Sequence, residues 1–176
     1  MPSTLVLGGA RSGKTAWAQR RAEGWGAEGG RLVMIVSAQA HDAEMAERIA
    51  RHRADRNGAW TTVEAPVDLV TSLAGLGHED IAVVDCLTLW LSNLMHTGAD
   101  LEAAFAALEA AVAACPAWLQ LISNEVGQGI VPDNPLARRF RDEAGRLHQS
   151  LAAVCDEAVM IVAGLPVWLK RPPPGI

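Results

Sequence analysis

The sequence predicts an α/β fold in which a mainly parallel sheet is flanked by helices, and three observations carry this prediction. Short apolar runs alternate with helical patterns along the 176 residues. The runs are continuously apolar rather than alternating, as in strands that are buried on both faces. A glycine-rich loop directly follows the first run, at the strand end where open α/β sheets bind their ligands.

The elements are expected in the following order. Five apolar runs predict strands at Leu5–Leu7, Leu32–Val36, Ile81–Val84, Leu119–Ser123 and Ala158–Ala163. Helical patterns cover residues 14–25, 42–56, 66–73, 87–95, 101–114 and 135–154. Asp100 is a suitable N-cap for the fifth helix, and Asn134 followed by Pro135 favours the start of the last. Val167–Leu169 is expected to add an edge strand in a C-terminal hairpin. We expect one domain over residues 1–170 and a loose, proline-rich tail at 171–176.

Composition and charge exclude several classes of protein. The net charge of −5 gives no general attraction for nucleic acid or for anionic lipid. No apolar run approaches the roughly 18 residues of a membrane span, and the first residues lack the pattern of a secretory signal. Cys86, Cys115 and Cys155 are far apart and without a C-x-x-C partner, which fits small buried side chains in a reducing compartment. We therefore expect a cytoplasmic protein.

A complete G-x-x-x-x-G-K-[ST] phosphate loop lies near the start of the chain, formed by Gly8, Gly9, Ala10, Arg11, Ser12, Gly13, Lys14 and Thr15. Its glycines allow successive backbone N–H groups to point at phosphate oxygens, with the positive end of a helix dipole behind them. Lys14 can reach the outer phosphates, and the Thr15 hydroxyl can ligate Mg²⁺. The fold class expected is therefore that of the phosphate-loop (P-loop) NTPases, with a RecA-like sheet.

Asp85 ends the apolar run that precedes the helical pattern at 87–95. A carboxylate at this place in a P-loop protein is suited to hold Mg²⁺ through water. Aspartate is also a preferred N-cap, so a second interpretation places Asp85 at the start of the next helix, and the two roles are compatible. Ligands bind at the carboxyl ends of strands in open sheets, and this favours the metal role.

His52 lies in the helical pattern at 42–56, where Glu44, Arg48, His52 and Arg56 follow one another at a spacing of four residues. Two flanking guanidinium groups favour a neutral imidazole and also attract phosphate. Such a histidine can attack phosphorus as a nucleophile, although an exposed helical histidine would show the same spacing. The other histidines, His41, His78, His96 and His148, lack this setting and are expected to be structural.

Ser123–Pro135 leaves a predicted strand, turns through two glycines and enters a helix. Loops at that edge of a parallel sheet line the ligand crevice, so Asn124 and Glu125 are candidates for contact with a substrate or a metal. A plain surface turn would look much the same.

Together these motifs resemble the bifunctional adenosylcobinamide kinase/adenosylcobinamide-phosphate guanylyltransferase family of cobalamin biosynthesis. The resemblance extends from Leu5 to about Lys170. It rests on the phosphate loop and on Asp42–Met45, Arg48-Ile49, His52, Arg56, Trp60, Val84–Trp90 and the long match Ser123–Arg146. The last of these is the most specific, because a general phosphate-loop enzyme does not require it.

The resemblance implies roles for individual residues. The guanylylated histidine of the family corresponds to His52, where some relatives carry two adjacent histidines and this chain has Arg51-His52. Lys14 would act with it in catalysis, and Thr15 and Asp85 would hold the metal. Besides the phosphate loop and Asp85, the implied nucleotide contacts are Val36, Ser37, Ala38, Arg53, Ala54, Asp55, Arg56 and Glu64.

The resemblance also implies the activity. The enzyme would phosphorylate the aminopropanol hydroxyl of adenosylcobinamide with GTP or ATP and Mg²⁺. It would then transfer GMP from GTP, through a GMP-histidine, to adenosylcobinamide phosphate, giving adenosylcobinamide-GDP. A homotrimer is implied as well, with no nucleic-acid partner. Two other hypotheses compete with this one: a simple small-molecule kinase with a structural His52, and a nucleotide-driven switch protein. The second would require switch segments and a water-positioning residue, and no clear candidate for these is found.

Overall fold

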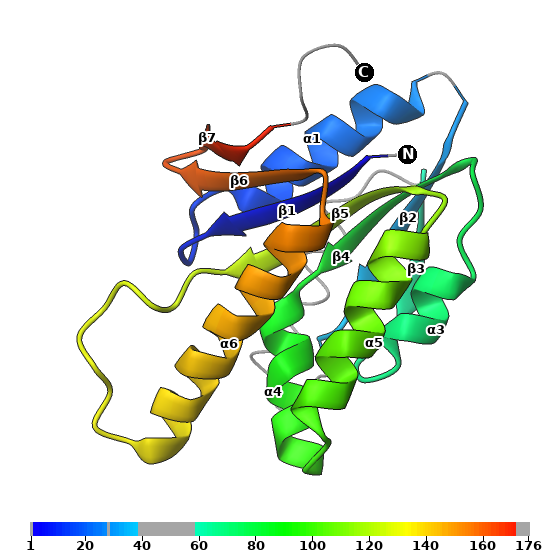
Figure 1. Ribbon diagram of the computed structural model, residues 1–176. Helices are drawn as coiled ribbons and strands as arrows, with labels where there is room; N and C mark the ends of the chain where they lie inside the picture. Colours follow the sequence, from blue (N-terminus) through cyan, green and yellow to red (C-terminus); the bar gives the residue numbers. More distant parts are fainter. Residues whose placement is uncertain (1, 28, 39–58, 172–176) are drawn as a thin grey trace.

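A seven-stranded sheet forms the centre of the protein, seen in a computed structural model that describes residues 2–27, 29–38 and 59–171. The strand order is β3-β2-β4-β5-β1-β6-β7 (Figure 1). The strands are β1 (Ser3–Gly8), β2 (Arg31–Val36), β3 (Trp60–Glu64), β4 (Asp80–Asp85), β5 (Trp118–Asn124), β6 (Glu157–Val162) and β7 (Leu165–Lys170). All neighbouring pairs are parallel except β6 and β7, which are antiparallel. The predicted α/β fold and its C-terminal hairpin are thus confirmed.

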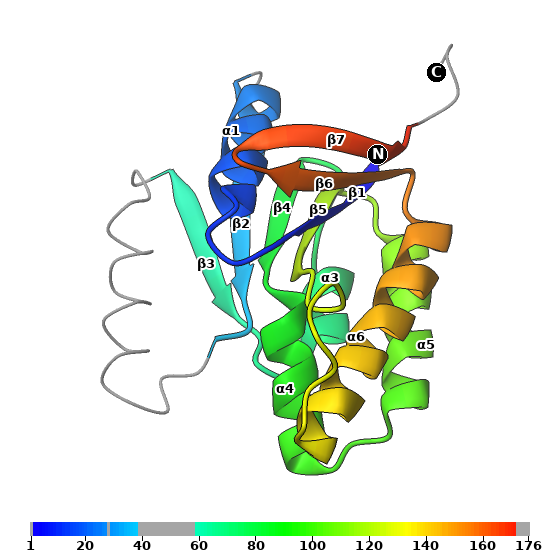
Figure 2. The same cartoon turned by 90° about the vertical axis from the view of Figure 1, so that its left-hand side faces the viewer.

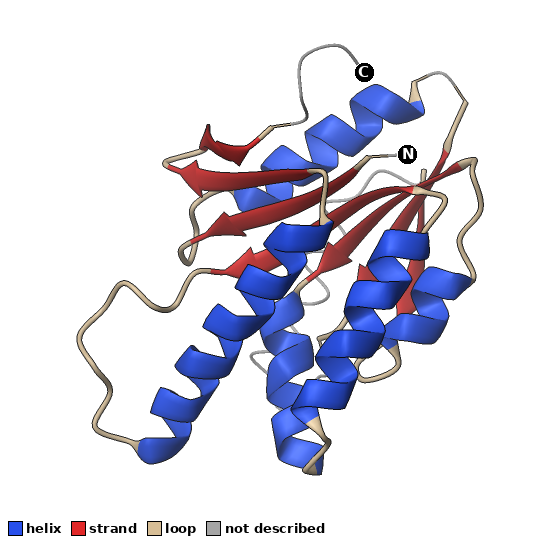
Figure 3. Cartoon of the chain, viewed as in Figure 1, coloured by secondary structure: helices blue, strands red, loops and turns tan. Residues whose placement is uncertain are grey.

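Helices cover both faces of this sheet (Figures 2 and 3). The helices of the described residues are α1 (Lys14–Gly26), α3 (Leu69–Ala74), α4 (Leu87–Thr97), α5 (Leu101–Ala114) and α6 (Pro135–Val154). Helix α1 lies on one face, and α3 to α6 lie on the other. Among the described helices, none is both long and apolar enough to cross a bilayer.

Two apolar layers hold the helices to the sheet, because successive residues of a strand point to opposite faces. In β1, Leu5 and Leu7 belong to the cluster under α3–α6, whereas Val6 belongs to the cluster under α1. Trp90 of α4 is fully buried in the first cluster, and its indole Nε1–H donates to the carbonyl of Val67 at 2.8 Å. Continuously apolar strands therefore follow from burial on both faces.

The helix ends agree with the predicted caps in two cases. The Asp100 side chain accepts from the N–H of Ala103 at 3.1 Å, and Asn134 accepts from the N–H of Leu136 at 2.8 Å. The helix expected from residue 66 begins later, at Leu69, because Asp68 is its N-cap and accepts from the N–H of Thr71.

Strand β3 is absent from the prediction. It is an edge strand whose side chains are exposed or half-buried, so it has no apolar run to mark it. The β-branched residues Thr61, Thr62 and Val63 are the signal that could have found it. The helix expected over 42–56 lies outside the described residues.

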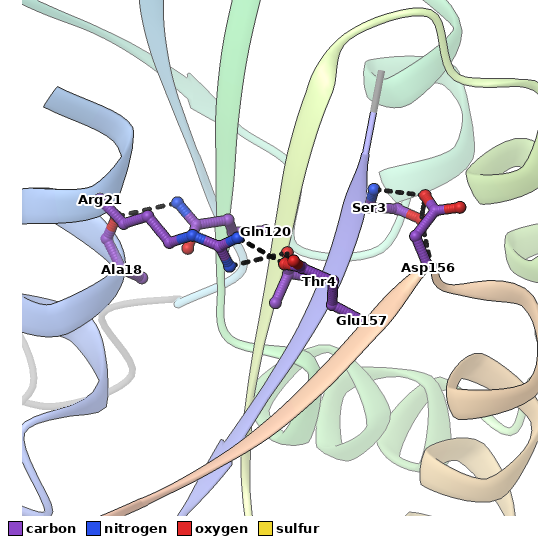
Figure 4. A network of polar contacts seen from close by, with 7 residues as sticks. All are labelled: Ser3, Thr4, Ala18, Arg21, Gln120, Asp156 and Glu157. Atoms are coloured by element: carbon purple, nitrogen blue, oxygen red, sulfur yellow. Dashed lines mark hydrogen bonds and ion pairs between the residues drawn. The ribbon is translucent and has the colours of Figure 1, made fainter. Parts of the chain in front are cut away.

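Polar side chains join α1 to the starts of β1 and β6 (Figure 4). Arg21 donates to the Thr4 hydroxyl at 3.1 Å and also binds the Glu157 carboxylate, to which Thr4 donates at 2.8 Å. The Arg21 guanidinium lies 4.5 Å from the centre of the Trp25 ring, an additional cation–π contact. Next to this cluster, Asp156 accepts from the N–H and the hydroxyl of Ser3. The Arg21 contacts fix α1 to the sheet at the strand starts, at the opposite end of β1 from the phosphate loop.

Candidate active site

The glycine-rich loop connects β1 to α1 and is shaped by close backbone contacts. Gly13 has a φ of 92°, in the left-handed region that favours glycine. A Cβ on Gly8 would lie 2.8 Å from the carbonyl oxygen of Ile161 in β6, so only glycine fits there. The N–H of Gly164, in the β6–β7 turn, donates to the Ser12 carbonyl at 2.8 Å. The hairpin therefore forms one wall of the loop.

Two side chains of the loop carry groups suited to phosphate. Lys14 is buried, and its ammonium donates to the Gly9 carbonyl at 3.0 Å, so the positive charge lies across the loop. The Ser12 hydroxyl is also buried and has no hydrogen-bond partner among the described residues. A buried polar atom without a partner is costly, and a phosphate oxygen would satisfy it. The loop thus fits an anionic ligand at the N-terminus of α1.

Thr15 and Asp85 meet as the sequence predicts. The Thr15 hydroxyl donates to Asp85 Oδ2 at 3.3 Å, and Asp85 is the last residue of β4. The N-cap of α4 is Cys86, whose side chain makes no cap hydrogen bond, so Asp85 does not occupy the N-cap position of this helix. A hydroxyl and a carboxylate are hard oxygen donors, the type that Mg²⁺ takes together with substrate phosphates and water. These residues fit the expected metal.

The other predicted contact residues lie at the same edge of the sheet. Val36, Glu64 and Asp85 occupy the same level at the ends of β2, β3 and β4. The hydroxyl of Ser37 is buried, donates to the Cys86 carbonyl at 2.6 Å and accepts from the Cys86 N–H at 3.1 Å. Ser37 therefore connects the ends of β2 and β4, and Ala38 follows it half-buried. Their contact with a nucleotide stays a prediction.

Five of the predicted residues lie outside the described part of the chain. They are His52, Arg53, Ala54, Asp55 and Arg56. Their roles therefore stay predictions.

The end of β5 carries two polar side chains. The sequence singles out Asn124 but not the contact of Ser123 with His148. Asn124 pairs with Gly8 in the sheet, and its amide donates to the Thr88 hydroxyl at 2.7 Å. Ser123 Oγ lies 2.7 Å from Nε2 of the buried His148 on α6. His148 shares the buried face of α6 with Ala144, Leu147 and Leu151, and this spacing is the signal that could have separated it from the other histidines.

The sheet, the phosphate loop and the Thr15–Asp85 pair define a P-loop nucleotide-binding enzyme. Comparison with solved structures gives the same fold. The P4 protein of bacteriophage phi6 in complex with ADP matches with a TM-score of 0.51 and 12% identity, over 99% of this chain and 56% of that chain. The flagellar accessory protein FlaH of Methanocaldococcus jannaschii matches with a TM-score of 0.55 and 11% identity, over 97% and 79%.

The particular family is shown by sequence. The model of the cobinamide kinase / cobinamide phosphate guanyltransferase family matches residues 4–169, and the chain belongs to this family of cobalamin biosynthesis enzymes. It is 45% identical to the bifunctional adenosylcobalamin biosynthesis protein CobP of Pseudomonas aeruginosa, over 96% of this chain and 98% of that protein. It is 40% identical to the bifunctional adenosylcobalamin biosynthesis protein CobU of Salmonella typhimurium, over 94% and 98%.

Proposed function

We propose that this enzyme phosphorylates the aminopropanol hydroxyl of adenosylcobinamide with GTP or ATP, and then transfers GMP from GTP to adenosylcobinamide phosphate through a GMP-histidine. The observation that carries the proposal is the phosphate loop, whose Thr15 meets Asp85, in a chain that belongs to this family. The product of the second reaction is adenosylcobinamide-GDP.

In the kinase reaction, the substrate hydroxyl attacks the γ-phosphate and a nucleoside diphosphate leaves. Lys14 and the N–H groups of the loop stabilise the charge that develops on the transferred group. The Ser12 hydroxyl supplies a further donor that already faces no protein acceptor in the described part of the chain. Thr15 and Asp85 would hold Mg²⁺, which when bound neutralises charge on the outer phosphates.

In the guanylyl transfer, His52 Nε2 or Nδ1 attacks the α-phosphate of GTP and pyrophosphate leaves. The phosphate of adenosylcobinamide phosphate then displaces the imidazole. A neutral imidazole is both a good nucleophile and a good leaving group, so one difficult displacement becomes two easier ones. An ordinary histidine pKa near ~6.5 leaves most molecules neutral at pH 7.

The test is incubation of the enzyme with GTP labelled at the α-phosphate. We expect a protein adduct that is labile in acid and stable in base, formed by the wild type and by His78→Ala, which changes an exposed histidine. His52→Ala should form none and should retain phosphorylation of adenosylcobinamide. An adduct on the His52→Ala protein would contradict the covalent route, and a wild type that forms none would favour a simple kinase.

The homotrimer, the preferred nucleotide of the kinase step and the cytoplasmic location are also proposals. Light scattering on the purified protein measures the first, and steady-state kinetics with ATP and GTP measure the second.

A further inference from the structure

Glu125 lies beside the phosphate loop. It directly follows β5, and its backbone N–H donates to the carbonyl of Gly8 at 3.0 Å. Gly8 is the first residue of the loop, so the main chain at Glu125 adjoins the strand end from which the loop departs. Because β5 lies next to β1 in the sheet, this proximity is fixed by the ladder.

The carboxylate of Glu125 accepts one hydrogen bond and has a second polar neighbour. Oε1 accepts from the N–H of Gly127 at 2.5 Å, and Oε2 lies 3.9 Å from Nδ1 of His148. The Glu125 side chain is still 22% exposed, so a substrate can reach it. A Cβ on Gly127 would come within 2.9 Å of Oε1, which shows how closely the turn wraps this carboxylate.

His148 is the second neighbour of the Glu125 carboxylate. Burial lowers the pKa of the His148 imidazole, and the nearby Glu125 carboxylate only partly opposes this effect, so the ring is neutral at pH 7. If the Ser123 hydroxyl donates to Nε2, the ring hydrogen sits on Nδ1 and points towards Glu125. In that tautomer the positive end of the imidazole dipole, at Nδ1–H, faces the negative carboxylate.

Three acidic side chains stand at or next to the carboxyl ends of strands in the described part of the chain: Glu64, Asp85 and Glu125. Asp85 already receives the Thr15 hydroxyl, the partner expected of a metal site. Glu64 ends β3, four strands away from β1, which is about 19 Å at the usual strand spacing. Glu125 directly follows β5, the strand adjacent to β1, and among the described residues no hydroxyl donates to its carboxylate.

We propose that Glu125 is the general base of the kinase reaction and that His148 is its positioning residue, an inference that rests on the proposed function. As the acceptor oxygen forms its bond to the γ-phosphorus, the bond from that phosphorus to the bridging oxygen breaks and the nucleoside diphosphate leaves. The hydroxyl proton passes to the Glu125 carboxylate and from there to water. The guanylylation of the enzyme by GTP uses no acceptor hydroxyl, so it does not need this base.

The test compares the two reactions in Glu125→Gln, which keeps the size of the side chain and removes the base. We expect kcat for phosphorylation of adenosylcobinamide to fall about 10²- to 10³-fold, with KM for the nucleotide unchanged. The amount of enzyme–GMP adduct formed from α-labelled GTP should equal that of the wild type, which controls for folding and nucleotide binding. Glu102→Gln, on the exposed side of α5, is the matched control and should change neither reaction.

Three results would overturn the assignment, and they differ from one another. If Glu125→Gln keeps the kinase turnover of the wild type, Glu125 is not the base, and the proposed function is unaffected. Turnover that Glu125→Gln recovers at high Mg²⁺ would make Glu125 a metal ligand instead of a base. A wild type without adenosylcobinamide kinase activity would overturn the proposed function, and the base assignment with it.

The positioning role of His148 is tested by a double-mutant cycle. His148→Phe should lower kcat of the kinase reaction about tenfold without changing KM for the nucleotide, and His148→Gln, which keeps an N–H, should lose less. In the Glu125→Gln background, His148→Phe should cause no further loss, because the group it positions is gone. Additive losses would mean that His148 acts only on the structure and would overturn its positioning role.

Discussion

At the two ends of the parallel strands, the contacts described for the carboxylate side chains differ in length. At the strand starts, Arg31 binds Asp80 through two hydrogen bonds of 2.6 and 2.8 Å, and Arg21, Thr4 and Glu157 form a closed cluster. At the strand ends, Thr15 and Asp85 are 3.3 Å apart, and His148 and Glu125 are 3.9 Å apart. The Ser12 hydroxyl has no partner in the described part of the chain.

This difference separates stability from function. Short, complete pairs satisfy each other and contribute to folding, whereas loosely paired groups keep donors and acceptors for a ligand. Changes at the strand starts should therefore lower the free energy of unfolding and spare turnover. Changes at the strand ends should do the reverse.

The largest effect is expected from the two lysines of the sequence, which lie at opposite edges. Lys14→Ala should lower both activities about 10²- to 10³-fold, because the positive charge over the loop is lost, while the melting temperature changes little. Lys170 donates to the carbonyls of Ala152, Ala153 and Cys155 at the end of α6, so Lys170→Ala should lower stability by about 1 kcal/mol and leave kcat unchanged. Steady-state kinetics and thermal denaturation of both variants test these expectations. Lost stability in Lys14→Ala together with lost activity in Lys170→Ala would refute the separation of stability from function.

The next effect concerns Thr15. Thr15→Val keeps the shape of the side chain and removes the hydroxyl, so kcat should fall about 10²-fold and the Mg²⁺ requirement should rise. Thr15→Ser keeps the hydroxyl and should stay near the wild type. If Thr15→Val and Thr15→Ser behave alike in a Mg²⁺ titration, the hydroxyl has no part in metal binding.

A smaller effect is expected from Glu157→Gln, which leaves the Arg21 guanidinium without its charged partner. Because both side chains are largely buried, we expect a loss of about 2 kcal/mol in the free energy of unfolding, measured with urea. Turnover at a temperature where the variant is still folded should be unchanged. Glu143→Gln removes a pair in which Glu143 is half-buried but the Arg146 side chain is 68% exposed to water, and it should cost less than about 0.5 kcal/mol, so equal losses would contradict this account.

The smallest effect is a dependence of stability on pH. Hydrogen bonds from Arg31 hold the pKa of Asp80 below its usual range, against the effect of burial. Burial would raise the pKa of Asp156, but the N–H and hydroxyl of Ser3 outweigh it and the pKa is lowered. Both carboxylates therefore add stability above their unfolded pKa of about 3.9, and this stability is lost as the pH falls through their lower folded pKa values.

Urea unfolding at a series of acid pH values measures this loss, which we expect to be small because the Arg31 side chain is half exposed. Asp80→Asn should be less stable at pH 7 and should lose less on acidification. An Asp80→Asn variant with the same acid dependence as the wild type would show that other groups are responsible.

Most of the sheet could be predicted from the sequence because its central strands are buried on both faces and leave continuous apolar runs. Strand β3 could not, since it is an edge strand with exposed side chains. The phosphate loop could be predicted because its residues are consecutive, and Asp85 because it ends an apolar run. The contact between Ser123 and His148 could not, because it depends on how α6 packs against β5. The Arg21–Glu157 pair, 136 residues apart, depends on the order of strands in the same way.

The position of β1 has a consequence for synthesis of the protein. Its two ladder partners are β5 and β6, and the glycine turn that supports its loop comes later still, at Gly164. Strand β1 therefore cannot complete its ladder until both β5 and β6 have been synthesised. Nascent chains that stop before β6 should therefore be unable to retain nucleotide, because β1 and its loop would lack one ladder partner and the support of Gly164.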